Sequence, residues 1–175
     1  MFAVIRGAGD IASGIALRLK HAKFDIVMLD IEHPTAIRRT VCFSQALVNG
    51  SMKVEDVTAF KVENTEEALE IIKEGNIAVM ADEKAESVKL FKPDFLIDAV
   101  LEPESYEGKT VRMQGELVSY PHPFTGEDCH AVIETQRGHY LGRVIKEGFA
   151  AENTGVPGNI GGYTVERIIR AVKDG

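Results

Sequence analysis

The stretch Phe2-Ala-Val-Ile-Arg-Gly-Ala-Gly-Asp-Ile-Ala-Ser-Gly-Ile-Ala-Leu-Arg-Leu19 decides the fold of this chain. Its apolar start, residues 2–5, predicts a short buried strand, because a brief apolar run that ends at glycine is typical of one. Gly7 and Gly9 then predict a tight turn. After the turn, apolar residues recur at helical spacing, at Ile11, Ile15, Leu17 and Leu19. The stretch therefore predicts a strand, a tight turn and a helix in that order.

The turn matches the dinucleotide-binding fingerprint G-x-G-x-x-G/A, with Gly7, Gly9 and Ala12 at its small positions. A side chain at position 9 would keep a pyrophosphate from the backbone, and the amino end of the next helix offers free N–H groups. The fingerprint also needs an acid about 20 residues later to bind ribose hydroxyls, and Asp30 ends the strand-like run 24–30. We predict a nucleotide site here. The alternative is a tight crossover that binds nothing.

Other polar residues extend the candidate cofactor-binding site. Asp10 and Ser13 belong to the start of the expected helix, and Asp10 has two interpretations: its carboxylate repels a diphosphate, or it caps the helix. Arg38 and Arg39 follow the second strand, close to the glycine turn in topology. Their guanidinium groups either hold a phosphate through bidentate hydrogen bonds or form a solvated pair on a helix opened by Pro34. Both interpretations of the arginine pair stay open.

Strand-like and helix-like segments alternate along the first hundred residues. Besides the elements above, we expect short strands within 52–62, helices at 43–48, 63–75 and 84–91, and strands at 77–80 and 95–101. This alternation predicts an α/β fold, a Rossmann-like parallel sheet with helices on both faces and a ligand crevice at the carboxyl ends of the strands. We expect a Rossmann-like cofactor-binding domain over 1–101 and a β-rich C-terminal extension over 102–175, packed on the C-terminal edge of the sheet.

Composition excludes several classes of function. The chain has 175 residues, of which 45% are hydrophobic, enough for one core and a small appended unit. Its net charge of −7 argues against nucleic-acid binding, which needs a basic surface. We expect no membrane span, because no apolar run is long enough, and no signal peptide, because the first residues lack the basic region and long apolar stretch of one. Its two cysteines, Cys42 and Cys129, lack metal-type spacing, so we expect a cytoplasmic protein. The oligomeric state, including a homo-oligomer, stays open.

The densest set of reactive side chains lies in residues 128–145. A strand there places His130 and Glu134 on one face, where they form a candidate pair for catalysis. Two ligands are fewer than a catalytic zinc site uses, so we predict no metal, and we favour a structural ion pair or a hydrogen-bonded core histidine. Arg137 and His139 lie in an expected hairpin turn, with a returning strand at 142–145. The catalytic residues stay unknown, with His130, Glu134 and His139 as candidates.

Four separated motifs, covering nearly the whole chain, resemble the selenium-dependent molybdenum hydroxylase system proteins. They are Arg-Gly-Ala-Gly-Asp-Ile-Ala-Ser-Gly (6–14), Ala-Ile-Arg-Arg-Thr-Val-Cys-Phe-Ser-Gln-Ala (36–46), Phe-Thr-Gly-Glu-Asp-Cys-His-Ala-Val-Ile-Glu-Thr-Gln-Arg-Gly-His (124–139) and Asn-Thr-Gly-Val-Pro-Gly-Asn-Ile-Gly-Gly-Tyr (153–163). Such proteins in turn look like distant relatives of the xanthine dehydrogenase accessory factors, which carry molybdenum cofactor. Members usually continue into a small β domain similar to lipoyl-type folds, whereas this sequence ends at Gly175.

The resemblance implies an accessory factor that helps a molybdenum hydroxylase apoenzyme to mature. On this interpretation the glycine turn, Arg38 and Arg39 hold the phosphate or nucleotide end of a molybdenum cofactor. A group made of His130, Glu134, Arg137 and His139 is expected above it, at the carboxyl rim of the sheet. One alternative is an NAD(P)-dependent oxidoreductase in which Asp30 selects NAD and His130 or His139 acts as the acid–base. Another is a scaffold that docks a partner and binds no ligand.

Overall fold

The fold was analysed in a computed structural model that describes residues 1–100, 116–118, 129–136, 138–148 and 150–151. Of residues 116–118 it describes the backbone. The elements of the first hundred residues are β1 (Phe2–Arg6), α1 (Asp10–His21), β2 (Asp25–Asp30), the 3-10 helix η1 (Arg39–Val41), α2 (Gln45–Asn49), β3 (Ser51–Val54), β4 (Val57–Val62), α3 (Thr65–Lys73), β5 (Ile77–Ala81), α4 (Val88–Phe91) and β6 (Phe95–Asp98). They are followed by β7 (Glu116–Val118), β8 (Val132–Ile133) and β9 (Val144–Ile145).

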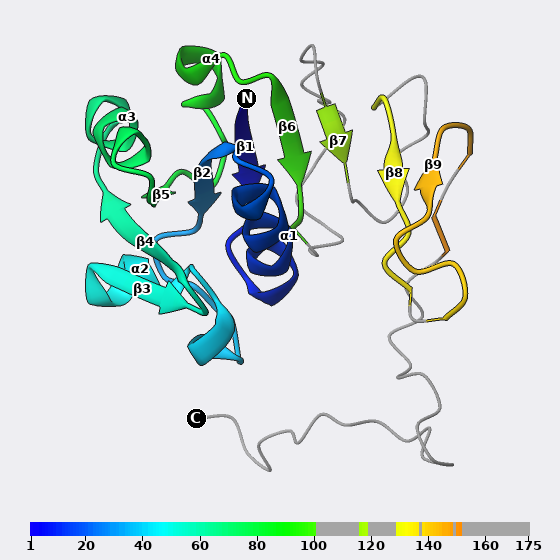
Figure 1. The fold of residues 1–175 in the computed structure, drawn as a ribbon, viewed down its shortest axis with the longest axis horizontal. Helices are drawn as coiled ribbons and strands as arrows, with labels where there is room; N and C mark the ends of the chain where they lie inside the picture. The colour runs from blue at the N-terminus through cyan, green and yellow to red at the C-terminus, as the bar shows by residue number, and fades with distance from the viewer. Residues whose placement is uncertain (101–115, 119–128, 137, 149, 152–175) are drawn as a thin grey trace.

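These strands form one sheet in the order β3-β4-β5-β2-β1-β6-β7-β8-β9. The strands from β4 to β8 in that order are parallel to their neighbours, and the edge strands β3 and β9 are antiparallel. From β1 the chain passes to β2, continues to β3 and β4 at the edge of the sheet, and returns to β5 between β4 and β2. It then crosses to the other side of β1 at β6 (Figure 1). The Rossmann-like α/β fold expected from the sequence is confirmed.

Helices cover both faces of the sheet because the central strands are apolar on both sides. Helices α1 and α2 pack on the face that carries Ile5, Met28 and Ile97. The opposite face, with Val4 and Leu29, is covered by α3 and α4. Strands buried on both faces are expected to be continuously apolar, as β1 and β2 are. The carboxyl ends of these strands are the natural place for a ligand.

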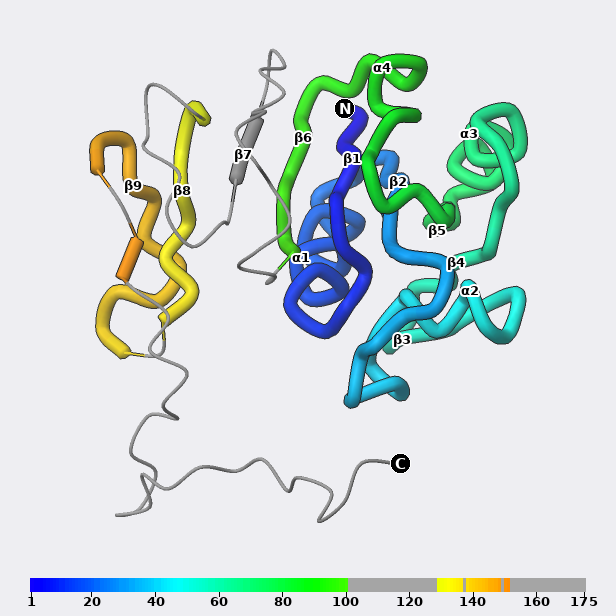
Figure 2. The backbone as a smooth tube through the Cα atoms, turned by 180° about the vertical axis from the view of Figure 1, so that it is seen from behind, coloured from blue at the N-terminus to red at the C-terminus, as the bar shows by residue number. Residues whose placement is uncertain are grey.

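The β8–β9 hairpin extends the sheet beyond β7, at the side of the molecule opposite to α2 and α3 (Figure 2). It has a small core of its own, in which Cys129, Val132 and Ile145 are buried. The returning strand of the hairpin, expected at 142–145, is β9 at Val144–Ile145. In the part of the chain that the structure describes, no helix is long and apolar enough to cross a membrane.

Two local expectations differ from the structure. Pro34 does not open a helix, since the residues after β2 run as a loop up to the 3-10 helix η1. A local and a tertiary contact hold the chain here: the Sγ of Cys42 donates to the carbonyl oxygen of Arg38, four residues earlier, at 3.0 Å, and the amide of Phe43 donates to the hydroxyl of Ser13 in α1 at 2.8 Å. Helix α4 is also shorter than expected, because the residues before Val88 form turns.

Candidate functional site

A cleft of about 360 Å³ lies at the carboxyl ends of β2, β1 and β6. At β1 the strand order reverses, since β2 pairs with one side of β1 and β6 with the other. Parallel α/β sheets bind ligands in the crevice at such a reversal. The lining residues come from the glycine turn, the loop after β2 and the end of β6: Gly7, Gly9, Asp10, Ile11, Ala12, Asp30, Thr35, Ala36, Ile37, Arg38, Cys42, Ala99 and Val100.

Gly7 is required by the fold. Its φ is +96°, a conformation that side chains strongly disfavour. A Cβ at this position would also lie 3.1 Å from the carbonyl oxygen of Ala99 and 3.5 Å from Cγ2 of Val100. The amide of Gly7 donates to the carbonyl oxygen of Leu29 at 2.6 Å. Gly7 thus brings the chain close to the ends of β2 and β6.

Gly9 is different, because nothing in the fold demands a glycine there. Its φ of −68° suits any residue, and a Cβ built on it meets no described atom within 4 Å. Gly9 lines the cleft, so that empty space is the cleft itself. Among the described residues, no acceptor is found for the amides of Gly9, Asp10 and Ala12. Free amides at the start of a helix attract anions.

Asp30 lies at the end of β2, where the fingerprint requires an acid. One carboxylate oxygen accepts from the amide of Ala8 and the other from the amide of Ile31, each at 2.8 Å. Burial raises the pKa of Asp30, and the two amides oppose that effect. A carboxylate has about four lone-pair sites, so hydrogen-bonding capacity remains for ribose hydroxyls. Asp30 therefore both holds the glycine turn and faces the cleft.

Asp10 and Arg38 form an ion pair at the cleft. An Nη2 hydrogen of Arg38 is donated to Oδ2 of Asp10, while Oδ1 accepts from the amide of Ile11 at 3.0 Å. The side chain of Arg38 is 69% exposed, and that of Asp10 is 30% exposed. The carboxylate of Asp10 thus uses two donors at the start of α1, the amide of Ile11 and the guanidinium of Arg38. Arg39 begins η1 and does not line the cleft.

Ser13 lies beneath the turn and does not line the cleft. It is 1% exposed, and its hydroxyl donates to the carbonyl oxygen of Ala8 at 3.2 Å and accepts from the amide of Phe43 at 2.8 Å. The amide of Ser44 also donates to the carbonyl oxygen of Ala8, at 2.9 Å. Ser13 is therefore a buried link between the turn and the start of α2.

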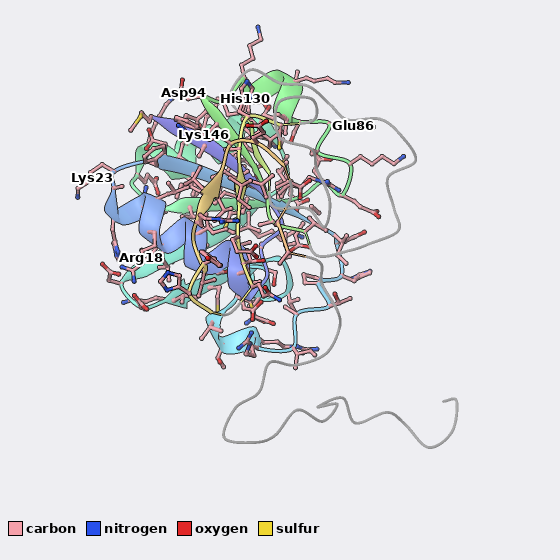
Figure 3. All side chains as sticks on the ribbon, turned by 90° about the vertical axis from the view of Figure 1, so that its right-hand side faces the viewer. Arg18, Lys23, Glu86, Asp94, His130 and Lys146 are labelled. Atoms are coloured by element: carbon pink, nitrogen blue, oxygen red, sulfur yellow. The ribbon has the colours of Figure 1, made fainter. Side chains whose placement is uncertain are left out.

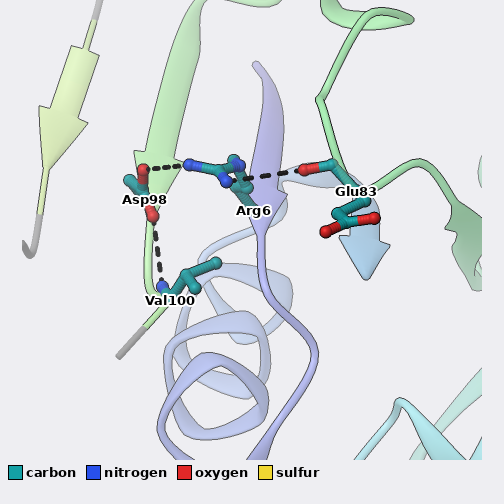
Figure 4. Close-up of polar contacts among 4 residues, drawn as sticks. All are labelled: Arg6, Glu83, Asp98 and Val100. Atoms are coloured by element: carbon teal, nitrogen blue, oxygen red, sulfur yellow. Dashed lines mark hydrogen bonds and ion pairs between the residues drawn. The ribbon is translucent and has the colours of Figure 1, made fainter. Parts of the chain in front are cut away.

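A part-buried ion pair joins β1 to β6 beside the cleft (Figure 4). Nη1 of Arg6 lies 2.8 Å from Oδ2 of Asp98, and Nη2 donates to the carbonyl oxygen of Glu83 at 3.4 Å. The second oxygen of Asp98 accepts from the amide of Val100 at 3.1 Å. Burial raises the pKa of Asp98, and the nearby Arg6 opposes the shift. Asp98 thus positions Val100, which lines the cleft.

The sequence missed much of the cleft wall. Thr35, Ala36 and Ile37 come from a loop expected to be helical. Ala99 and Val100 were expected inside a strand at 95–101, whereas β6 ends at Asp98 and both residues line the cleft. Cys42 also lines the cleft with a buried thiol. Burial, together with the negative charge of Asp10, raises the pKa of Cys42. The sequence could have indicated Ala99 and Val100 as cleft residues only if the apolar strand at their position had been known to pair with β1.

The second candidate group does not line the cleft. His130 precedes β8 and lies at the same end of the molecule as Asp94, which precedes β6 (Figure 3). It therefore lies at the amino ends of these strands, whereas the sequence placed it at the carboxyl rim. His139 lies in the turn between β8 and β9. Arg137 lies outside the described residues.

Glu134 holds the hairpin together. It is 5% exposed, and its carboxylate accepts from the amides of Gln136 at 2.7 Å and Ala151 at 2.9 Å. Burial of the carboxylate favours its neutral form, but these amides outweigh the burial and hold the pKa of Glu134 below its ordinary value. The expected pair with His130 does not form, because the carboxylate is occupied by backbone amides. No group of metal-binding side chains is found in the described ranges.

Comparison with known proteins gives one similar relative. The chain is 51% identical over 169 residues to "Uncharacterized protein YqeB" of Escherichia coli strain K12, and the match covers 96% of this chain and 31% of that protein. The chain thus spans about a third of the length of this relative. No protein-family model matches the sequence, and no solved structure gives a significant match. The name of the relative states no activity, so the comparison brings none to this chain.

Proposed function

We propose that the chain binds a nucleotide or another phosphorylated cofactor at Gly7-Ala8-Gly9, and that it does so as an accessory factor for molybdenum hydroxylases. The observation that carries the binding proposal is Gly9. The fold would accept a side chain at this position, yet the residue is glycine and faces a cleft beside free amides. A phosphate that approaches the backbone explains the glycine, because a Cβ would block it.

The walls of the cleft suit a nucleoside. Ala36, Ile37 and Val100 provide apolar surface for a base, and Ile37 is 95% exposed although it is large and apolar. Asp30 offers carboxylate oxygens for ribose hydroxyls at the end of β2. A 2′-phosphate would face the same carboxylate, which favours ligands with a free 2′-hydroxyl. The proposed ligands are therefore nucleotides, or cofactors with a nucleotide end.

The accessory role rests on the four sequence motifs that resemble the selenium-dependent molybdenum hydroxylase system proteins. Two of these motifs, residues 6–14 and 36–46, supply most of the cleft wall. The two motifs are far apart in sequence but line the same cleft. Their proximity supports a shared role in holding the cofactor. A molybdenum hydroxylase apoenzyme would be the partner that receives it.

An NAD-dependent oxidoreductase is the second candidate, favoured by the carboxylate of Asp30 at the end of β2. Such an enzyme needs an acid or base beside the nicotinamide. Among the described residues that line the cleft there is no histidine, lysine or tyrosine, and the thiol of Cys42 has a raised pKa. The available geometry therefore supports binding better than hydride transfer.

The test compares the same substitution at two glycines of this segment, one just before α1 and one within it. Gly9→Ala places a methyl group in the cleft, and Gly14→Ala places one in open space on the outside of α1. Thermal melts and calorimetric titrations would use AMP, ADP, NAD, NADP, FAD, CTP and a molybdopterin preparation. We expect at least one ligand to bind the wild type and Gly14→Ala, and to bind Gly9→Ala about tenfold more weakly, or about 1.4 kcal/mol. Equal affinity in all three proteins would contradict the site.

The same panel separates the candidate roles. Binding of a molybdopterin species without nicotinamide binding supports the accessory factor. Binding of NAD alone, with a change in nicotinamide absorbance on adding a substrate, supports the oxidoreductase. A docking scaffold predicts that no ligand stabilises any of the three proteins. A ligand at a hundred times its Kd adds about 2.7 kcal/mol to stability, which a melt detects readily.

A further inference from the structure

Asp10 places a negative charge at the point of the cleft where a phosphate would bind. It is the first residue of α1, directly after Gly9, and it lines the cleft. Its Oδ1 accepts from the amide of Ile11 at 3.0 Å, and its Oδ2 pairs with Arg38. The carboxylate thus binds two donors that would otherwise be available to an anion: the amide of Ile11 and the guanidinium of Arg38.

The formal charges of the cleft limit how much negative charge a ligand can bring into it. Of the residues that line it, Asp10 and Asp30 are acidic and Arg38 is basic. Two carboxylates and one guanidinium leave one net negative charge. Arg39, the other candidate cation, does not line the cleft. Each additional negative charge on a ligand therefore meets repulsion that the helix and Arg38 only partly offset.

We propose that Asp10 is a specificity-determining residue that selects a nucleoside, or a ligand with a single phosphate, over one with a diphosphate at the glycine turn. This inference rests on the proposed function, because it concerns the ligand class of the same cleft. Gly9 leaves space for a phosphate against the backbone, and Asp10 limits how much negative charge that space accepts. The glycine turn has the backbone shape of a pyrophosphate site, but the carboxylate of Asp10 offsets part of the positive charge that Arg38 and the helix amides provide.

Arg38 gives the selection its mechanism. A phosphate that enters the cleft competes with the carboxylate of Asp10 for Arg38, so binding exchanges one ion pair for another. The exchange gains little for the first phosphate and leaves Asp10 without its partner. A second phosphate then meets an unpaired carboxylate. Without the carboxylate at position 10, Arg38 and the helix amides would all be available to the ligand.

The experiment measures how the effect of Asp10 depends on ligand charge. Adenosine, AMP and ADP would be titrated by calorimetry into the wild-type protein and into Asp10→Asn. Asparagine removes the charge but keeps an amide oxygen that can accept from the amide of Ile11. Asp25→Asn is the matched control: it removes the same charge from an exposed position at the start of β2, away from the cleft. We expect Asp10→Asn to bind adenosine with less than about a twofold change and ADP about tenfold more tightly, with AMP between them.

The outcomes are distinct for the two proposals. A gain that rises from adenosine to ADP in Asp10→Asn, and is absent in Asp25→Asn, supports the role of Asp10. An equal change for all three ligands, or no change, overturns that role while the nucleotide site stands. If neither the wild type nor Asp10→Asn binds any of the three ligands, the role of Asp10 is overturned, and the proposed nucleotide site falls with it if the other nucleotides and the molybdopterin preparation also fail to bind.

Discussion

Gly7 and Gly14 lie in the same stretch but in opposite environments, so the same substitution should change stability in opposite directions. Gly7→Ala places a Cβ 3.1 Å from the carbonyl oxygen of Ala99 at a φ of +96°. We expect it to lower the free energy of unfolding by about 1–3 kcal/mol. Gly14→Ala, in an exposed helix position with no atom near its Cβ, should raise it by about 0.5–1 kcal/mol. Urea unfolding measures both, and a loss of stability in Gly14→Ala would contradict this account.

Ser13 has a structural role at the site, although its position directly after the fingerprint suggested contact with a cofactor. Ser13→Ala leaves the buried amide of Phe43 without its acceptor. An unsatisfied buried donor costs about 1–3 kcal/mol, and we expect that loss in the free energy of unfolding from urea denaturation. Ser51→Ala, at an exposed position of β3, is the control and should change little. If both variants are equally stable, the hydroxyl of Ser13 has no structural role.

The β8–β9 hairpin should depend on pH through Glu134. Its pKa is lowered in the folded protein, so its contribution to stability is present above the unfolded value of about 4.3 and is lost as the pH falls through the folded pKa. Glu134→Gln removes this dependence. The protection factors of the Val132 and Ile145 amides, which correct the exchange rates for their intrinsic dependence on pH, should therefore fall below about pH 4.3 in the wild type, relative to pH 7. In Glu134→Gln this fall in the protection factors should be smaller, and an identical pH profile in the two proteins would exclude this role.

At the level of elements, local patterns predicted most of the first hundred residues. Helix α3 was readable from its ends, since Asn64 accepts from the amide of Glu67 at 2.9 Å and Gly75 has a φ of +86°. The loop after β2 was not, because its path is fixed by bonds to residues far away in sequence, such as that between Phe43 and Ser13. A helix-opening proline has no effect where such contacts hold the chain in another conformation.

In the candidate site too, some residues could be predicted from local sequence, whereas others depend on how distant parts of the chain pack together. Gly7, Gly9, Ala12 and Asp30 were found from one local fingerprint, and these residues line the cleft together with Asp10, which directly follows Gly9. The wall at Ala99 and Val100 depends on β6 crossing to the free side of β1, which no spacing in the sequence encodes. Likewise, the expected approach of His130 depended on strand direction, and the parallel pairing of β8 places it at the other end.

The ion pair of Arg6 and Asp98 fastens the two halves of the sheet where the strand order reverses, so its loss should affect the entire molecule. The two side chains are only 12% and 17% exposed. Removing one member of a buried pair leaves the other charge uncompensated, and Asp98→Ala should lower the free energy of unfolding by about 3–5 kcal/mol in urea denaturation. The double variant Arg6→Met, Asp98→Leu should recover much of that loss, because it removes both charges. Glu63→Ala, which breaks the exposed pair with Lys61, is the control and should change little. If Asp98→Ala is as stable as this control, the pair does not join the halves, and Val100 must be positioned by packing alone.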